Sequence, residues 1–190
     1  MKNKLILGLL FLLFALPFSA QAEEVIISTN TTILADDVSL EGKDLVVDGV
    51  TLTINGSHRF NTLSLINSSV LTHDIETSEK LLLTIDNELS IDKDSKIDVS
   101  AKGLLPSDEV GLLCGGSYGG PGGLYQSNSS NAPYGNYLAP LDFGMGGRGN
   151  GTNTTRGGGA LKIIASVLNL SGKIQANGET NSNWGTGSGG

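Results

Sequence analysis

Residues 82–103 read LLTIDNELSIDKDSKIDVSAKG, and their outline returns near the end of the chain, where residues 161–178 read LKIIASVLNLSGKIQANG. Both segments carry apolar residues at offsets 0, 3, 7 and 9, and both then end on Lys-Ile and a closing Gly. The same outline at two distant places indicates a repeated structural unit.

Short alternating clusters fill the chain before this stretch, as in residues 45–47 (LVV) and 63–65 (LSL). Alternation with period two predicts strands, and no stretch after residue 22 has helical periodicity. Residues 44–55 (DLVVDGVTLTIN) and 62–73 (TLSLINSSVLTH) share one outline at an offset of 18. Polar pairs and triplets between the clusters predict turns: Asp48-Gly49, Asn55-Gly56-Ser57, Asn67-Ser68-Ser69 and Asp86-Asn87.

The predicted fold class is all-β: a parallel β-helix, or solenoid, with a long Gly/Tyr-rich loop insertion. One short coil cannot bury its inward Leu, Ile and Val alone, whereas stacked coils form a continuous aliphatic core. A β-sandwich is the alternative, because it also has short alternating strands. We expect a leader over residues 1–22, solenoid rungs over 23–103, the Gly/Tyr-rich loop segment over 104–159, and a returning, truncated rung over 160–190.

The N-terminus has the pattern of a secretory signal peptide. Two lysines precede an apolar run, which ends at a small-residue A-x-A site, Ala20-Gln21-Ala22. We therefore expect a protein that is secreted or held at the cell surface, with no membrane span after removal of the leader. The net charge is −7, or −9 once the two lysines of the leader are removed, which disfavours nucleic acid as a partner. Cys114 is the only cysteine, so no intrachain disulfide can form, and we expect it to be buried.

The glycine-rich segment between the two repeats has an unusual composition. Residues 115–159 hold fifteen of the 27 glycines and all four tyrosines. A flexible linker has few aromatic residues, so we favour an ordered loop over a floppy one. Residues 144–149 (GMGGRG) match a dinucleotide-binding glycine pattern, but the polar, glycine-rich residues that follow cannot begin the helix that this site requires.

The order of motifs along the second half resembles a glycine-rich β-helical module of large secreted or cell-surface, adhesin-like proteins. The resemblance covers residues 82–190, with SKIDVSAKG, GGSYGGPGG, YGNYLAPLDFGMGG, GGGALKIIASVLNLSGKIQANGE and GTGSGG in sequence. It implies a structural or adhesin-like role and no catalytic residues. Ala101 stands where the module usually has Gly. Because the final glycines of the module usually lead into another strand, we expect the sequence to be a fragment or to be followed by a further domain or partner.

No other group of residues predicts a chemical site. His58 and His73 are expected as surface turn residues, because a metal centre needs three or four ligands. The acidic run from Asp86 to Asp98 lacks the order of a calcium loop, so weak calcium binding by turn carboxylates stays open and no cofactor is expected. We find no G-x-S-x-G nucleophile motif and no paired-carboxylate site, and predict no enzymatic activity. Seven Asn-x-Ser/Thr sequons leave glycosylation and a bacterial or eukaryotic source open.

These observations predict an extracellular structural or adhesin-like segment that displays a surface for contacts. Its expected partners are cell-surface or extracellular polysaccharide and protein components. The alternative is a module that binds or degrades polysaccharide and stacks sugar rings on the loop tyrosines, which are Tyr118, Tyr125, Tyr134 and Tyr137.

Overall fold

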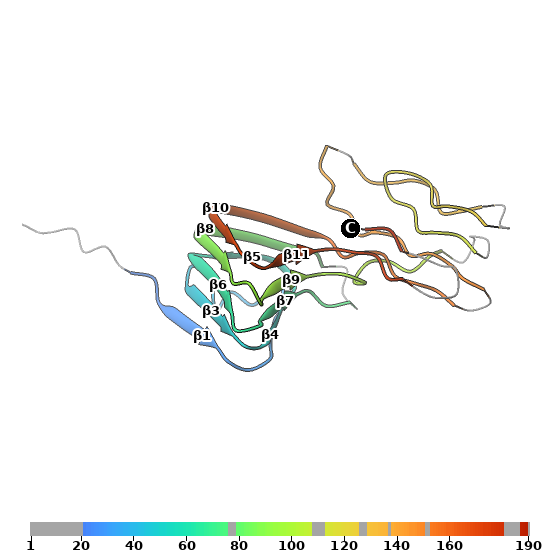
Figure 1. Ribbon diagram of the computed structural model, residues 1–190. Helices are drawn as coiled ribbons and strands as arrows, with labels where there is room; N and C mark the ends of the chain where they lie inside the picture. The colour runs from blue at the N-terminus through green and yellow to red at the C-terminus, as the bar shows by residue number, and fades with distance from the viewer. Residues whose placement is uncertain are drawn as a thin grey trace, which may run out of the picture.

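A computed structural model describes residues 21–75, 79–107, 113–125, 129–136, 138–150, 153–180 and 187–189. These residues contain eleven strands and no helix. The strands form two sheets, and every pair of neighbouring strands is parallel (Figure 1).

The chain passes back and forth between the two sheets. The first sheet has the order β1-β3-β6-β8-β10, with β5 beside part of β8; its strands are β1 (Glu24–Ile27), β3 (Asp44–Asp48), β5 (Gly56–Phe60), β6 (Thr62–Ile66), β8 (Leu81–Ile91) and β10 (Leu161–Leu170). The second sheet has the order β2-β4-β7-β9-β11; its strands are β2 (Thr31–Ile33), β4 (Thr51–Ile54), β7 (Val70–Thr72), β9 (Lys96–Asp98) and β11 (Lys173–Gln175).

The core consists of aliphatic side chains in rows that run from strand to strand. Register places Leu45 beside Leu63 and Leu63 beside Leu89, and all three are fully buried. Each row exists because one apolar position of each strand lies directly over the same position of its neighbour. The remaining buried core residues are Ile27, Ile33, Val47, Leu52, Ile54, Phe60, Leu65, Leu71, Leu81, Leu83, Ile85, Ile91, Ile97 and Val99.

The predicted β-helix or solenoid is wrong, because the strands do not recur at a regular interval. They vary from 3 to 11 residues in length, and 62 residues separate β9 from β10. The described part of that segment contributes only isolated bridges to the pairing. The β-sandwich alternative is wrong as well, because its sheets would be antiparallel. The structure instead has two parallel sheets, from one end of which the glycine-rich segment extends (Figure 1).

Strand β5 is the first irregular feature, and it lies where a turn is predicted. Gly56 has a φ of +86° and begins β5, so the Asn-Gly pair marks a bend between strands and not a hairpin. The inward side chains of β5 are His58 and Phe60. The strand was missed because its alternation is carried by Gly, His and Phe instead of by aliphatic residues.

A second predicted turn, Asp86-Asn87, lies inside β8. This strand pairs with β5 through Ile85 and with β6 from Leu89 onward, so it passes from one neighbour to the next at these two polar residues. Asn87 Nδ2 donates to Asn61 Oδ1 at 2.6 Å, and the Asn87 N–H donates to the Asn61 carbonyl at 2.9 Å. The polar pair therefore marks the junction of two shorter strands against one long strand.

The two repeated segments, residues 82–103 and 161–178, do pair, but with a shift. Leu89 lies beside Leu168 and Ile91 beside Leu170, as the shared outline predicts. In the first half of β10, however, Leu161 lies beside Leu81 and not beside Leu82, because the register shifts between Ala165 and Val167. A single extra residue in one strand produces such a bulge, and it cannot be recognised from apolar spacing alone.

Candidate functional site

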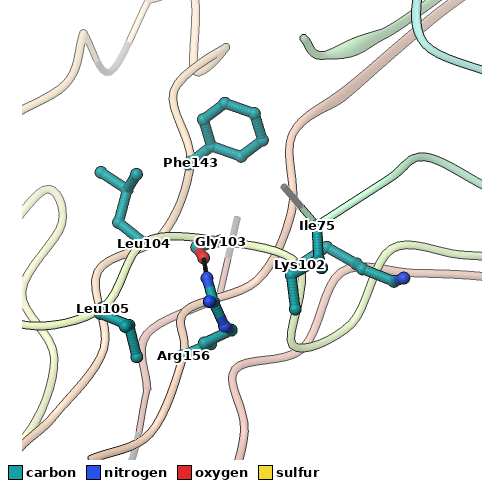
Figure 2. A pocket seen from close by; sticks show the side chains of 7 residues that line it. All are labelled: Ile75, Lys102, Gly103, Leu104, Leu105, Phe143 and Arg156. Atoms are coloured by element: carbon teal, nitrogen blue, oxygen red, sulfur yellow. Dashed lines mark hydrogen bonds between the residues drawn. The ribbon is translucent and has the colours of Figure 1, made fainter. Parts of the chain in front are cut away.

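One cavity, shown close up in Figure 2, is lined by residues that follow the strands and by residues of the glycine-rich segment. The chain reaches it from three places: after β7, after β9, and along the return from the glycine-rich segment to β10. It has a volume of about 180 Å³ and is lined by Ile75, Lys102, Gly103, Leu104, Leu105, Phe143 and Arg156. Pockets for small-molecule ligands usually measure roughly 300–1,000 Å³. This cavity therefore fits a group the size of one side chain.

The cavity combines an apolar wall with two cations. Ile75, Leu104, Leu105 and Phe143 supply the wall, and Leu105 is 46% exposed. Arg156 Nη1 donates to the Gly103 carbonyl at 3.2 Å, as Figure 2 shows. Neither Lys102 nor Arg156 forms an ion pair within the described ranges. The chemistry suits an apolar group that carries a carboxylate or other anion beside it.

The floor of the cavity is fixed by backbone hydrogen bonds between segments that are distant in sequence. Gly103 donates its N–H to the Gly157 carbonyl at 2.8 Å, and Leu104 donates to the Gly144 carbonyl at 2.9 Å. A Cβ at Gly103 would lie 2.3 Å from the Gly158 oxygen. The backbones approach too closely for any side chain, which explains the need for glycine here.

Phe143 connects the cavity with a buried histidine. The ring of His73 packs against Phe143 at 5.6 Å between centroids in an edge-to-face arrangement. His73 is fully buried and its Nδ1 lies 2.7 Å from the Asp74 carbonyl, whereas its Nε2 has no hydrogen-bond partner among the described residues. Burial lowers the pKa of His73 below its ordinary value of 6.5. The Asp74 carbonyl can only accept, so the proton of the neutral ring lies on Nδ1.

Neither histidine is a surface turn residue, contrary to the prediction from the sequence. His58 is 3% exposed, and its Nδ1 and Nε2 lie 2.8 Å and 3.1 Å from Glu41 Oε1 and the Asn55 carbonyl. Its ring stacks against Phe60 at 6.2 Å. The two histidines thus occupy inward positions of the core with different partners. Among the described residues, no group of three or more His, Cys, Asp or Glu side chains is arranged to hold a metal ion.

The tyrosines of the predicted sugar site do not form one platform. Tyr118 and Tyr134 pack edge to face at 5.2 Å, and the Tyr134 hydroxyl donates to the Phe143 carbonyl. Burial, with Tyr118 and Asp142 nearby, raises the pKa of Tyr134 to about 12. Tyr125 is 51% exposed, and Tyr137 lies outside the described residues. The Tyr118–Tyr134 pair therefore helps to position Phe143, and Tyr125 is the accessible ring.

The aspartates of the acidic run from Asp86 to Asp98 form contacts with nearby turns and strands. Asp86 pairs with Arg59 at 2.8 Å, and Asp92 accepts hydrogen bonds from the N–H groups of Asn67 and Ser95 at 2.7 Å each. Asp98 accepts from Lys96 and from Gln175 of β11 at 2.8 Å each. Each of these carboxylates thus stabilises a turn or a neighbouring strand.

Two further sequence features of the glycine-rich segment, Cys114 and the GMGGRG stretch, are packed against other parts of the protein. Cys114 is fully buried, as expected. Gly144 and Gly146 of the GMGGRG stretch lie against other backbone segments and not before a helix. The cavity itself was not predicted, because its lining comes from three distant places and its residue types carry no motif.

Comparisons with known proteins leave the family open. No protein-family model, no curated protein and no solved structure matches the chain. Within the described ranges, the structure has no helix with the length and apolar character needed to cross a bilayer.

Proposed function

We propose that the protein is a secreted, non-enzymatic structural module, adhesin-like in role, that contacts other extracellular components through its glycine-rich end. One observation carries the proposal: the cavity of Figure 2, an apolar and cationic contact point that a backbone hydrogen-bond network holds rigidly in place. A rigid site loses little conformational entropy when it binds. A cavity of this size supports attachment to a single exposed group of a larger partner.

The chemistry of the cavity favours a partner with an apolar group next to an acidic one. Burial of the apolar wall favours binding by roughly 25 cal/mol for each Å² of apolar surface that the partner covers. Lys102 and Arg156 add attraction for a neighbouring anion, despite the overall charge of −7. Protein side chains and acidic polysaccharides at a cell surface both present such groups.

The proposal can be tested by making the same substitution, Leu to Asp, at two positions and comparing the effects on binding. Leu105 lines the cavity, whereas Leu138 is 78% exposed in the glycine-rich segment outside the cavity. The immobilised protein is presented with extracellular polysaccharides and surface proteins, and binding is measured by interferometry. Leu105→Asp is expected to weaken binding by about tenfold, and Leu138→Asp should have little effect. Equal loss in both variants, or no binding to any component, would contradict the proposal.

A second candidate function is carbohydrate binding without a structural role. The observation in its favour is the half-exposed ring of Tyr125, a surface on which a sugar ring could stack. A glycan array with Tyr118→Ala, Tyr125→Ala, Tyr134→Ala and Tyr137→Ala separates the two candidates. Loss of a sugar signal in Tyr125→Ala alone supports carbohydrate binding. The absence of any bound sugar at high protein concentration excludes it.

A further inference from the structure

The outer edges of β10 and β11 are unpaired within the described chain, and β10 exposes apolar side chains there. These two strands are the last in their sheets. Leu168 and Leu170 face the core side of β10, yet they are 50% and 47% exposed. Their neighbours in β8, Leu89 and Ile91, are 0% and 1% exposed. No described residue therefore covers the core at this edge.

Among the described residues, none on the core side of β10 blocks a further strand. Edge strands are usually protected by an inward charge, a proline or a strong bulge. The bulge lies opposite Ser166 of β10, where β8 carries the extra residue, and the four residues of β10 after it pair regularly with β8. None of the residues after the bulge, Val167, Leu168, Asn169 and Leu170, is charged or proline. This half of the edge remains able to accept a parallel strand.

The rows of core side chains that end in β10 and β11 start at the opposite edge of each sheet, in β1 and β2. Val25 lies beside Leu45 and Ile27 beside Val47, so β1 supplies the first members of the two rows that end at Leu168 and Leu170. β2 does the same in the second sheet, whose rows begin at Thr31 and Ile33. One edge of the protein thus presents the side chains that the other edge lacks.

The connections at the two edges have the same length. Leu170 and Ile174 are four positions apart, and so are Ile27 and Thr31. The equivalent core residues inside the molecule are separated by five or six positions: Val47 and Leu52, Leu65 and Leu71, and Ile91 and Ile97. Equal connections allow β1 and β2 of one molecule to lie over β10 and β11 of another without a change of register.

We infer that β10 and β11 bind the β1 and β2 edge of a second copy of this chain, head to tail. Register would place Val25 of the added copy beside Leu168, and Ile27 beside Leu170. In the second sheet Thr31 would lie beside Ile174. This contact is heterologous, so its repetition produces an open, linear assembly.

Charge is compatible with this contact at short range and opposes it at long range. The outward positions would pair Glu24 with Val167 and Asn30 with Lys173, so no like charges lie directly opposite each other. Each copy nevertheless carries a net charge of −7. Salt screens that repulsion, so association should strengthen as the ionic strength rises. The inference does not depend on the proposed ligand contact, which uses a different part of the surface.

Sedimentation of the full chain, expressed with its own leader, tests the inference over a range of protein and salt concentrations. Leu168→Lys should weaken association by roughly tenfold or more, because it would place an ammonium group against an aliphatic row. Val25→Lys should do the same from the other edge, and Thr31→Lys serves as a second variant in case Val25→Lys does not fold. Ile164→Lys is the control, because Ile164 is 52% exposed on the outer face in the half of β10 before the bulge.

Mixing the variants decides the direction of the contact. Leu168→Lys retains an intact β1 edge and Val25→Lys retains an intact β10 edge, so each alone should be monomeric and an equal mixture should form a heterodimer that grows no further. A wild-type chain that stays monomeric under all conditions would overturn the inference. So would a mixture that stays monomeric, or a Leu168→Lys variant that still dimerises by itself.

Discussion

In the glycine-rich segment, one added Cβ atom would prevent close packing at some of the glycines. Gly146 lies so close to a neighbouring segment that a Cβ would be 1.7 Å from the Thr155 carbonyl oxygen, and a Cβ at Gly157 would be 2.0 Å from the Gly144 carbonyl. Such distances cannot be relieved by moving a side chain, because the obstacle is backbone. Glycine serves a similar purpose at the crowded axis of collagen.

Gly146→Ala and Gly157→Ala are therefore expected to lower the free energy of unfolding by about 1–3 kcal/mol, the cost of overpacking. Gly119 and Gly123 provide matched controls in the same segment, because a Cβ at either would meet nothing within 4 Å. Alanine at these positions should change stability by less than about 0.5 kcal/mol. Urea titration of the four variants measures the difference, and equal effects at all four positions would contradict close backbone packing.

The buried His73 makes the protein sensitive to mild acid. Its pKa is lowered in the folded state by burial, so between pH 6.5 and the lower folded value the unfolded chain binds more protons. Its contribution to stability is complete above pH 6.5 and is lost as the pH falls. The midpoint of urea unfolding should therefore decrease from pH 7 to pH 5, and His73→Leu should remove this part of the decrease. A His73→Leu variant with the wild-type pH profile would show that another group is responsible.

At the scale of elements, Asp98 joins two neighbouring strands. It lies at the end of β9 and accepts hydrogen bonds from Lys96 of the same strand and from Gln175 of β11. Burial alone would raise the pKa of Asp98, but hydrogen bonds from Lys96, Ser100 and Gln175 outweigh burial and hold the pKa well below its ordinary value of 3.8. The ionised carboxylate thus stabilises the β9–β11 edge.

Asp98→Asn should destabilise the protein by roughly 1–2 kcal/mol at pH 7, because charge-assisted hydrogen bonds are replaced by neutral ones. The contribution of Asp98 is present above pH 4 and is lost as the pH falls below this value. The wild-type protein should therefore lose stability between pH 4 and pH 2 more steeply than the variant. Asp94→Asn, in the preceding turn with its side chain 55% exposed, is the control and should change little. Thermal unfolding across this pH range is the measurement.

The strands themselves could be predicted from sequence better than their arrangement could. Alternating aliphatic residues mark β3 and β6, and their offset of 18 is the register found in the sheet. The irregular features were not visible, because β5 carries its pattern on His58 and Phe60, and one extra residue in β8, opposite Ser166 of β10, shifts the register between these two strands. A regular repeat was predicted because these two features leave no aliphatic signal.

The candidate site could not be predicted, for a different reason. Its lining residues have no common motif and meet only because the glycine-rich segment folds back on residues 102–105. The sequence did draw attention to the tyrosines, but Tyr134 is used to hold the Phe143 carbonyl. Aromatic residues in a glycine-rich segment indicate packing as readily as binding, and only the fold distinguishes between them.

At the scale of the whole molecule, stability should decrease from the middle of each sheet toward both edges. β6 has strands on both sides and fully buried core residues, whereas β1 and β10 have a described neighbour on one side only. Edge strands open with fewer broken contacts than central strands do, and hydrogen exchange reports the free energy of such local opening.

Amides of β6 should therefore exchange more slowly than those of β1 and β10, by roughly tenfold or more in a dilute sample. Exchange followed by mass spectrometry on peptides from the three strands provides the measurement. If copies associate as inferred, concentrating the protein should slow exchange in β1 and β10 together and leave β6 unchanged, because only the edges gain a neighbour. Leu168→Lys should abolish that dependence on concentration. Uniform exchange across all three strands would mean that the sheets open as one unit and that the exposed edge carries no separate weakness.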